Sequence, residues 1–249
     1  KMSQYWTGYT PESIPMVPAV LTDADLKSRK GYREAIEQGD VVLGLDKESV
    51  TIRLWKRNNM NLLVLSNKQN HMSTIIQYVM EQIGENEKKI VFAPEFHTMK
   101  YVADYEIISE KSAVEEMLEA MAYRITEKMK EQDDSSEVII AFYDYATFVS
   151  SLSMTAVEKL KFIIEKGRLV GYTCLVTTDP SITGKIDSAS KLVRQTDLLL
   201  LDMRVVDQNV ILPLNRNSRE PMLEFQEQWI IENKTAYKIQ VSYIGEIDE

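Results

Sequence analysis

Two kinds of segment alternate along most of the chain. Continuously apolar runs bounded by polar residues predict buried strands at 61–65, 89–92, 137–143, 172–177 and 197–202. Between them, apolar residues spaced three and four apart predict helices at 73–83, 111–132 and 155–166. Strands that are apolar on both faces and separated by helices are typical of a parallel sheet that helices cover on both sides. The pattern therefore predicts an α/β fold with a mostly parallel central sheet.

The two ends of the chain depart from this alternation. Residues 1–22 are rich in proline and predict a linker, so the folded domain is expected over residues 23–249. The first elements predicted within the domain are one helix and two strands, at 23–38, 41–46 and 49–54. The last two strands, at 222–231 and 235–244, predict a closing β-hairpin. A chain that opens on a linker is expected to be one module of a longer polypeptide.

Composition narrows the classes of partner. The 249 residues carry a formal net charge of −9, and the acidic balance counts against a nucleic-acid-binding surface. No apolar run approaches the roughly 18 residues of a membrane span, so no direct membrane contact is predicted. Cys174 is the only cysteine, which excludes an intrachain disulfide.

Candidate chemistry begins where the strand at 61–65 ends. An apolar strand, a polar loop and a Ser-Thr pair follow the order of the phosphate-binding pattern G-x-x-x-x-G-K-[ST]. On that template Ser66 and His71 take the glycine positions, Met72 the lysine position and Ser73 the hydroxyl position. A working loop needs glycines so that backbone N–H groups can surround phosphate oxygens, and a lysine to balance their charge. We therefore predict a vestigial nucleotide-binding segment, made of Ser66, Asn67, Lys68, Gln69, Asn70, His71, Met72, Ser73 and Thr74.

Another explanation of this segment stays open. An ordinary connection between a strand and a helix would have the same outline, with Ser73 or Thr74 capping the helix. Lys68 would then be an exposed loop lysine rather than a phosphate ligand. A metal site made by His71 and His97 with Glu95 is disfavoured, because their spacing fits no zinc motif.

Two later segments follow in the order that a nucleotide site would need. Asp144 ends the strand predicted at 137–143, where P-loop enzymes place an acid that holds Mg²⁺. Tyr145 stands where a catalytic base often follows. Farther along, Lys166-Gly167-Arg168-Leu169-Val170-Gly171 precedes a strand that ends in Thr177-Thr178-Asp179-Pro180-Ser181.

Together these segments resemble the FtsK/SpoIIIE branch of P-loop ATPases, which carries G-R-x-x-G and then A-T-Q-x-P-S. Val42-Leu43-Gly44-Leu45-Asp46 is similar to the lead-in strand of these domains, and 14–18 resembles the segment that joins tandem modules. Within the branch, the chain is most similar to the last ATPase module of the membrane-anchored motors of type VII secretion. The resemblance implies a RecA-like P-loop fold, with ATP and Mg²⁺ in intact modules.

The resemblance also implies a place and partners. The module would lie at the cytoplasmic face of the cell membrane, beside neighbouring ATPase modules of its own chain, and receive small helical WXG-type export substrates. The departures at His71, Met72, Tyr145 and Asp179 predict a pseudo-ATPase with weak or no nucleotide binding. No residue is assigned a catalytic role, and Asp144 is the Mg²⁺ ligand if the ion binds.

Two alternatives belong to other classes. The first is an active ATPase that drives protein export and either binds nucleotide by a non-standard loop or is completed by residues of a neighbouring module. Arg168 is a candidate arginine finger in trans, but an arginine near a helix C-terminus is commonly structural. The second is a DNA translocase, which the acidic balance disfavours.

Overall fold

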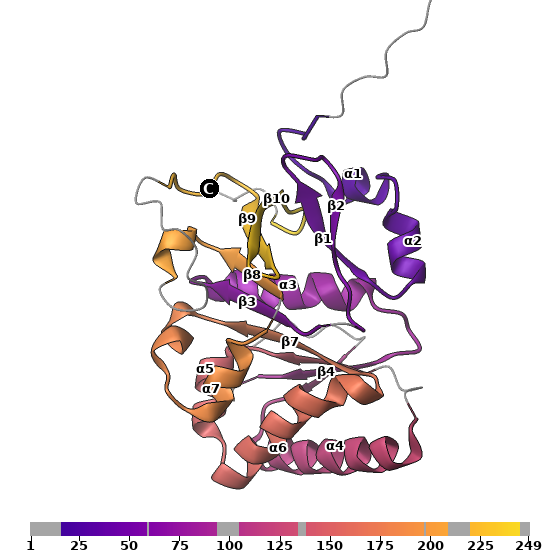
Figure 1. The fold of residues 1–249 in the computed structure, drawn as a ribbon, viewed down its shortest axis with the longest axis vertical. Helices are drawn as coiled ribbons and strands as arrows, with labels where there is room; N and C mark the ends of the chain where they lie inside the picture. Colours follow the sequence, from indigo (N-terminus) through magenta and orange to yellow (C-terminus); the bar gives the residue numbers. More distant parts are fainter. Residues whose placement is uncertain are drawn as a thin grey trace, which may run out of the picture.

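The computed structural model describes residues 16–58, 60–93, 105–133, 138–196, 198–208 and 220–244. Its centre is a single ten-stranded sheet with the order β2-β1-β10-β9-β8-β3-β7-β6-β4-β5 (Figure 1). The strands are β1 Val41–Asp46, β2 Ile52–Trp55, β3 Leu62–Ser66, β4 Lys88–Phe92, β5 Glu106–Ile108, β6 Val138–Phe142, β7 Tyr172–Thr178, β8 Leu198–Asp202, β9 Glu227–Glu232 and β10 Thr235–Gln240.

The sheet has a parallel part and an antiparallel part. The strands from β8 to β5 run parallel to one another, with β3 between β8 and β7. The β9–β10 hairpin then joins antiparallel to β8 on one side and to β1 on the other. This arrangement confirms the predicted α/β class, the mostly parallel sheet and the closing hairpin.

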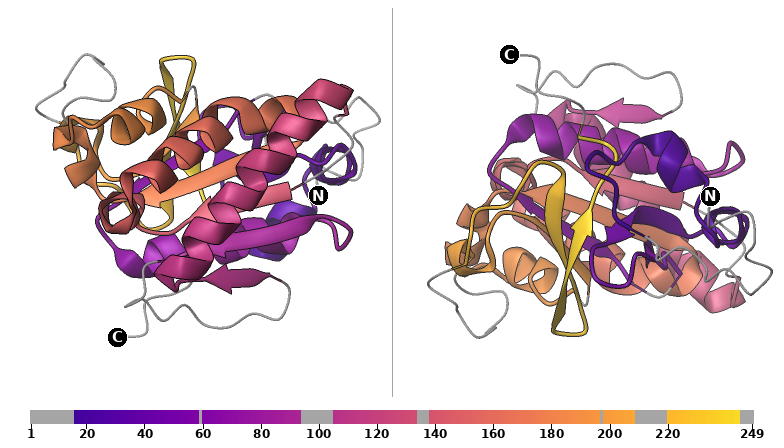
Figure 2. Two further views of the ribbon diagram at one scale, coloured as in Figure 1. Left: turned by 90° about the horizontal axis from the view of Figure 1, so that it is seen from below. Right: turned by 90° about the horizontal axis from the view of Figure 1, so that it is seen from above.

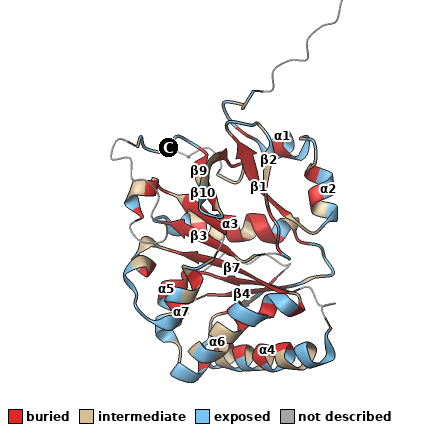
Figure 3. Cartoon of the chain, viewed as in Figure 1, coloured by how far each residue is buried: buried red, intermediate tan, exposed pale blue. Residues whose placement is uncertain are grey.

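Helices cover both faces of the sheet, as the continuously apolar strands predict. One face packs under α4, α5, α6 and α7, and the other under α3. The views of Figure 2 show α4 and α6 on the same face, and Figure 3 shows buried strands beneath helices whose outer surfaces are exposed. The helices are α1 Asp23–Lys27, α2 Tyr32–Glu37, α3 Gln69–Gln82, α4 Lys111–Glu131, α5 Tyr145–Ser151, α6 Met154–Lys166 and α7 Ser188–Val193, with 3₁₀ turns η2 Gly167–Val170, η3 Pro180–Gly184 and η4 Val205–Asp207.

Several predicted boundaries are wrong. The helix expected at 23–38 is two helices, because Gly31 adopts φ 87° and starts α2 anew. In the hairpin, β9 begins only at Glu227 and β10 ends at Gln240, and β2 begins three residues later than expected. The short elements β5, α5 and α7 were not predicted. Each is at most seven residues long, too short to show a clear hydrophobic period.

The lead-in strand β1 lies against the hairpin at very short range. A Cβ atom added to Gly44 would lie 2.5 Å from the carbonyl oxygen of Gln240 in β10. Any side chain at position 44 would therefore separate β1 from β10. The glycine in the lead-in motif is explained by this close approach.

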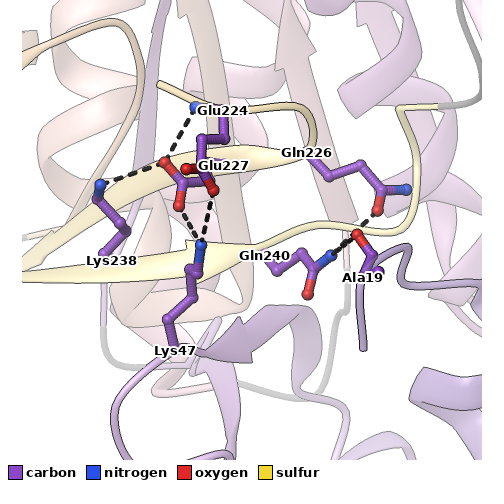
Figure 4. Close-up of polar contacts among 7 residues, drawn as sticks. All are labelled: Ala19, Lys47, Glu224, Gln226, Glu227, Lys238 and Gln240. Atoms are coloured by element: carbon purple, nitrogen blue, oxygen red, sulfur yellow. Dashed lines mark hydrogen bonds and ion pairs between the residues drawn. The ribbon is translucent and has the colours of Figure 1, made fainter. Parts of the chain in front are cut away.

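The segment before α1 is tied to the hairpin by side-chain amides. Gln226 accepts a hydrogen bond from the Leu21 amide at 2.8 Å and donates to the Leu21 carbonyl at 3.0 Å. Figure 4 shows Gln240 donating to the carbonyl of Ala19 nearby, at 3.3 Å. Leu21 is fully buried in a small core of its own with Leu26 and Val42. Packing therefore begins before residue 23, although the division into linker and domain stays a prediction.

A buried ion cluster lies beside these amides. Lys47, from the turn after β1, and Lys238, from β10, both pair with the Glu227 carboxylate, which is 3% exposed (Figure 4). The Glu224 amide donates to the same carboxylate at 3.0 Å. Burial raises the pKa of Glu227, but these three donors outweigh it and hold the pKa below its ordinary value. The cluster fastens β1 to the hairpin.

Candidate functional site

The topology places the predicted site residues at one edge of the sheet. The ends of β8, β3, β7 and β6 are neighbours there, with Ser66 in register with Asp202, and Leu65 with Thr178. Asp144 follows β6 and Asp179 follows β7 at the same edge. Ligands of open α/β sheets bind at the carboxyl ends of parallel strands. The sequence order therefore does bring the candidate segments together.

The loop itself is much shorter than predicted. The helix expected at 73–83 begins at Gln69, so only Asn67 and Lys68 separate β3 from α3. The amides of His71 and Met72 both donate to the Lys68 carbonyl, at 3.1 and 3.3 Å. These are the amides at the second glycine position and the lysine position of the template. Because they are used inside the first turn of α3, they do not form an open phosphate cradle.

The side chains of this turn are also engaged. Met72 is 2% exposed and packs in the core between α3 and the sheet, with Ile75, Ile76 and Val64 as members of the same cluster. The hydroxyls of Ser73 and Thr74 donate to the Asn70 carbonyl, at 2.9 and 2.7 Å. The position that holds lysine in the template therefore points into the protein. The position that holds the Mg²⁺-binding hydroxyl is bonded to its own helix.

Sequence reasoning missed a residue that organises this edge. Asp202, at the end of β8, accepts a hydrogen bond from Ser66 Oγ at 2.9 Å, and its Oδ2 also lies at hydrogen-bonding distance from His71 Nδ1. The Asp202 side chain is 8% exposed. Ser66 and His71 are the two residues at glycine positions of the template, and both are held by one carboxylate. The sequence does contain a signal for Asp202, because β8 is an apolar strand that ends in an acid, which is the same pattern that identifies Asp144 after β6.

The other two acids are placed differently. Asp144 is buried, adopts φ 46° and ψ 61°, and stands at the start of α5. The neighbouring Tyr143 hydroxyl donates to the Gln69 carbonyl at 3.4 Å, which joins this strand end to the start of α3. Asp179 caps η3 by accepting from the Ser181 amide at 2.6 Å. Asp144 therefore lies beside the candidate site, whereas the Asp179 carboxylate is occupied by its own turn.

The residue after Asp144 has no access to the edge. Tyr145 is fully buried, and its hydroxyl donates to the Ala189 carbonyl at 3.3 Å. Burial raises the pKa of Tyr145 above its ordinary value, so the phenol stays protonated. Arg168 lies in η2, before β7 begins, and so at the opposite edge of the sheet from Asp179. Neither residue serves the site of its own module.

Two further predictions concern a metal site and the membrane. Within the described ranges, no group of three or more His, Cys, Asp or Glu side chains is placed to hold a metal ion. His97 and Glu95 lie outside the described residues. None of the helices described here combines the length and apolar character that crossing a membrane requires.

The arrangement does not fit a triphosphate in the manner of a P-loop. The amides of His71 and Met72 are hydrogen-bonded to the Lys68 carbonyl, the lysine position is a buried methionine, and the hydroxyl position is internally bonded. Asn67, Lys68, Gln69 and Asn70 are exposed at the edge. What remains is a polar surface above the strand ends that includes the exposed Lys68.

Comparisons with known proteins agree with this architecture. No family model matches the chain. The type VII secretion system protein EssC of Staphylococcus aureus is 21% identical over 247 residues, which cover 96% of this chain and 16% of the relative. The chain therefore spans about a sixth of the length of the curated relatives that it matches.

Solved structures give the fold. EssC (ATPases 2 and 3) from Geobacillus thermodenitrificans superposes with a TM-score of 0.80 at 14% identity, covering 94% of this chain and 46% of that one. Thermomonospora curvata EccC (ATPases 2 and 3), in complex with a signal sequence peptide, gives 0.67 at 16% identity, covering 97% and 46%. The fold is that of the RecA-like P-loop ATPases.

Proposed function

Because the chain is homologous to the type VII secretion ATPase EssC over 96% of its length, we propose that it is a degenerate ATPase module of such a secretion motor. It would dock or regulate export substrates and hydrolyse little or no ATP. The observation that carries the proposal is the start of α3 at Gln69, which engages the amides of His71 and Met72 in hydrogen bonds and buries the Met72 side chain. Without the lysine, the charge of a transferring phosphoryl group loses one of its main stabilising partners.

The partners in the proposal come from the relatives. The related structures contain two ATPase modules and are about twice as long as this chain. This supports neighbouring ATPase modules as its partners. The related EccC structure holds a signal sequence peptide, which supports docking of small helical WXG-type substrates. As part of a membrane-anchored motor, the module would work at the cytoplasmic face of the membrane.

The test is isothermal titration of the chain with ATP and Mg²⁺, for wild type and for Asp144→Ala. We expect no heat beyond dilution for either protein. Saturable binding that is lost in Asp144→Ala would overturn the proposal. Titration with a small helical WXG-type substrate then tests the docking role. If that substrate does not bind, the proposed docking role is wrong.

One observation favours the alternative of an active ATPase module. The loop and Asp144 do share one edge, and Lys68 is exposed there. An active module with a non-standard loop, completed by a neighbour and driving export, would use these residues. It requires Mg²⁺-dependent ATP hydrolysis that depends on Asp144, which the same titration with a phosphate-release assay detects.

A further inference from the structure

A cavity of about 430 Å³ lies between α1, α2, α3 and the segment that follows β10. Its volume falls within the range of ligand-binding pockets. Of the described residues in its walls, only Ile36 carries an aliphatic hydrocarbon side chain. The walls therefore offer tyrosine rings and polar groups rather than aliphatic side chains.

Three tyrosines supply the aromatic part of the walls. They are Tyr32 from α2, Tyr78 from α3 and Tyr243 from the segment after β10. The rings of Tyr78 and Tyr243 lie 4.9 Å apart at 42°. Their hydroxyls are held by the Val42 carbonyl and by Gln228, which fixes the orientation of both rings. Burial raises the pKa of each tyrosine, so the phenols stay neutral. The tyrosines can therefore contact a ligand through the π faces of their rings.

Two carboxylates add negative charge. Asp23 and Glu81 line the cavity from α1 and α3, and both are exposed. The single basic residue of the lining, Lys27, pairs with Asp23 at 2.5 Å. The bond to Asp23 is the main cause that raises the pKa of Lys27, and the nearby Glu81 adds to it. The cavity thus already stabilises one ammonium group and has one carboxylate in excess.

Ser242 contributes a hydroxyl to the walls. Its Oγ is buried and lies near the Tyr78 hydroxyl, so it belongs to the polar surroundings of Tyr78 rather than to the exposed surface of the cavity. Tyrosine faces and carboxylates are the groups that recognise an ammonium or guanidinium ion. A carboxylate or phosphate ligand would be repelled by Asp23 and Glu81.

We propose that this cavity binds an organic cation, an ammonium or guanidinium group, between Tyr32, Tyr78 and Tyr243 and the carboxylates of Asp23 and Glu81. The cation would come either from a free polyamine or from a basic side chain of a protein partner. Because the walls join α1 and α2 to α3, an occupant would link the N-terminal helices to the helix that begins at the candidate site. This cavity borders the candidate site, because Thr74, the last residue of the predicted vestigial segment, also lies in its walls.

The test is isothermal titration of the whole chain with spermidine and with acetyl-Gly-Arg-Gly-amide, using acetyl-Gly-Glu-Gly-amide as the anionic control. We expect saturable binding of a cation and none of the anionic peptide. The tighter of the two cationic probes identifies the source. Failure of both cations to bind at millimolar concentration would overturn the proposal.

Paired variants separate recognition from damage to the fold. Glu81→Gln should weaken cation binding about fivefold, whereas Lys27→Gln should strengthen it about threefold, because Asp23 is released from its internal partner. Glu131→Gln, at the exposed end of α4, is the matched control and should leave the affinity unchanged. Equal affinities for Glu81→Gln and the wild type would sink the idea. Unfolding of a variant would lower affinity in every case, so opposite signs for Glu81 and Lys27 exclude that explanation.

Discussion

Restoring the lysine of the phosphate-loop template should destabilise this protein rather than activate it. The change is Met72→Lys, at a side chain that is 2% exposed and packs in the cluster between α3 and the sheet. The new ammonium would enter an apolar environment in the first turn of α3. If position 72 instead faced a phosphate cradle, the same change would be harmless and would favour ATP.

The cost has two parts. Losing the buried methionine side chain removes about 1.5–3 kcal/mol of hydrophobic stabilisation. Keeping the lysine neutral at pH 7, if burial lowers its pKa to about 6, costs roughly 4–5 kcal/mol more. Bending of the long stem toward solvent would recover part of this. We expect a loss of at least about 3 kcal/mol, against a total stability of about 5–15 kcal/mol for a typical domain.

Urea unfolding, followed by circular dichroism and by the fluorescence of the buried Trp55, measures the effect. Met72→Leu is the matched control, because a swap of similar volume should cost less than about 1.5 kcal/mol. The reasoning is refuted if Met72→Lys keeps the stability of the wild type and gains ATP binding. That result would mean that α3 begins later than Gln69.

Three further predictions test other parts of the structure. Arg57 and Glu87 form a buried bidentate pair, with N–O distances of 2.6 and 2.9 Å, so Arg57→Ala should cost about 3–5 kcal/mol in urea unfolding, and a loss below about 1 kcal/mol would contradict this. Because the folded pKa of Glu227 is depressed, its contribution to stability is full above the unfolded value near 4.5 and is lost as the pH falls. The destabilisation by Glu227→Gln should therefore shrink between pH 7 and pH 3. Burial raises the pKa of Cys174 to about 12, so a thiol reagent should label it only in urea, and fast labelling of the native chain would contradict its burial.

How much of the fold could be predicted depends on which forces set each element. The apolar strands and the long helix α4 were placed within about one or two residues, because burial on both faces leaves a strong pattern. The start of α3 is wrong in the prediction, because the observed N-cap is Lys68, which provides no side-chain cap. The capping-type residues Asn67 and Asn70 lie on either side of it. Tertiary contacts extend the helix there instead, through burial of Met72 and the contact between His71 and Asp202.

The candidate site shows the same division. The acid after β6 was predicted from its place in the chain order, and the topology puts it at the expected edge. The role of Asp202 depends on pairing between β3 and β8, which are separated by more than 130 residues. A single sequence does not reveal that pairing. The acid at the end of β8 could be predicted, but its contacts with Ser66 and His71 could not.

The departures from the phosphate-loop template are connected to one another. Ser66, at the first glycine position, ends β3 and bonds to Asp202. His71, at the second, contacts the same carboxylate, and Met72 fills the core beneath the turn. Glycine at position 71 would cost the helix about 1 kcal/mol relative to alanine, so its replacement also favours the early start of α3. Each residue that removes a feature of the phosphate cradle therefore supplies a contact that closes it. For this reason, restoring any one template residue should remove a stabilising contact before it creates a phosphate ligand.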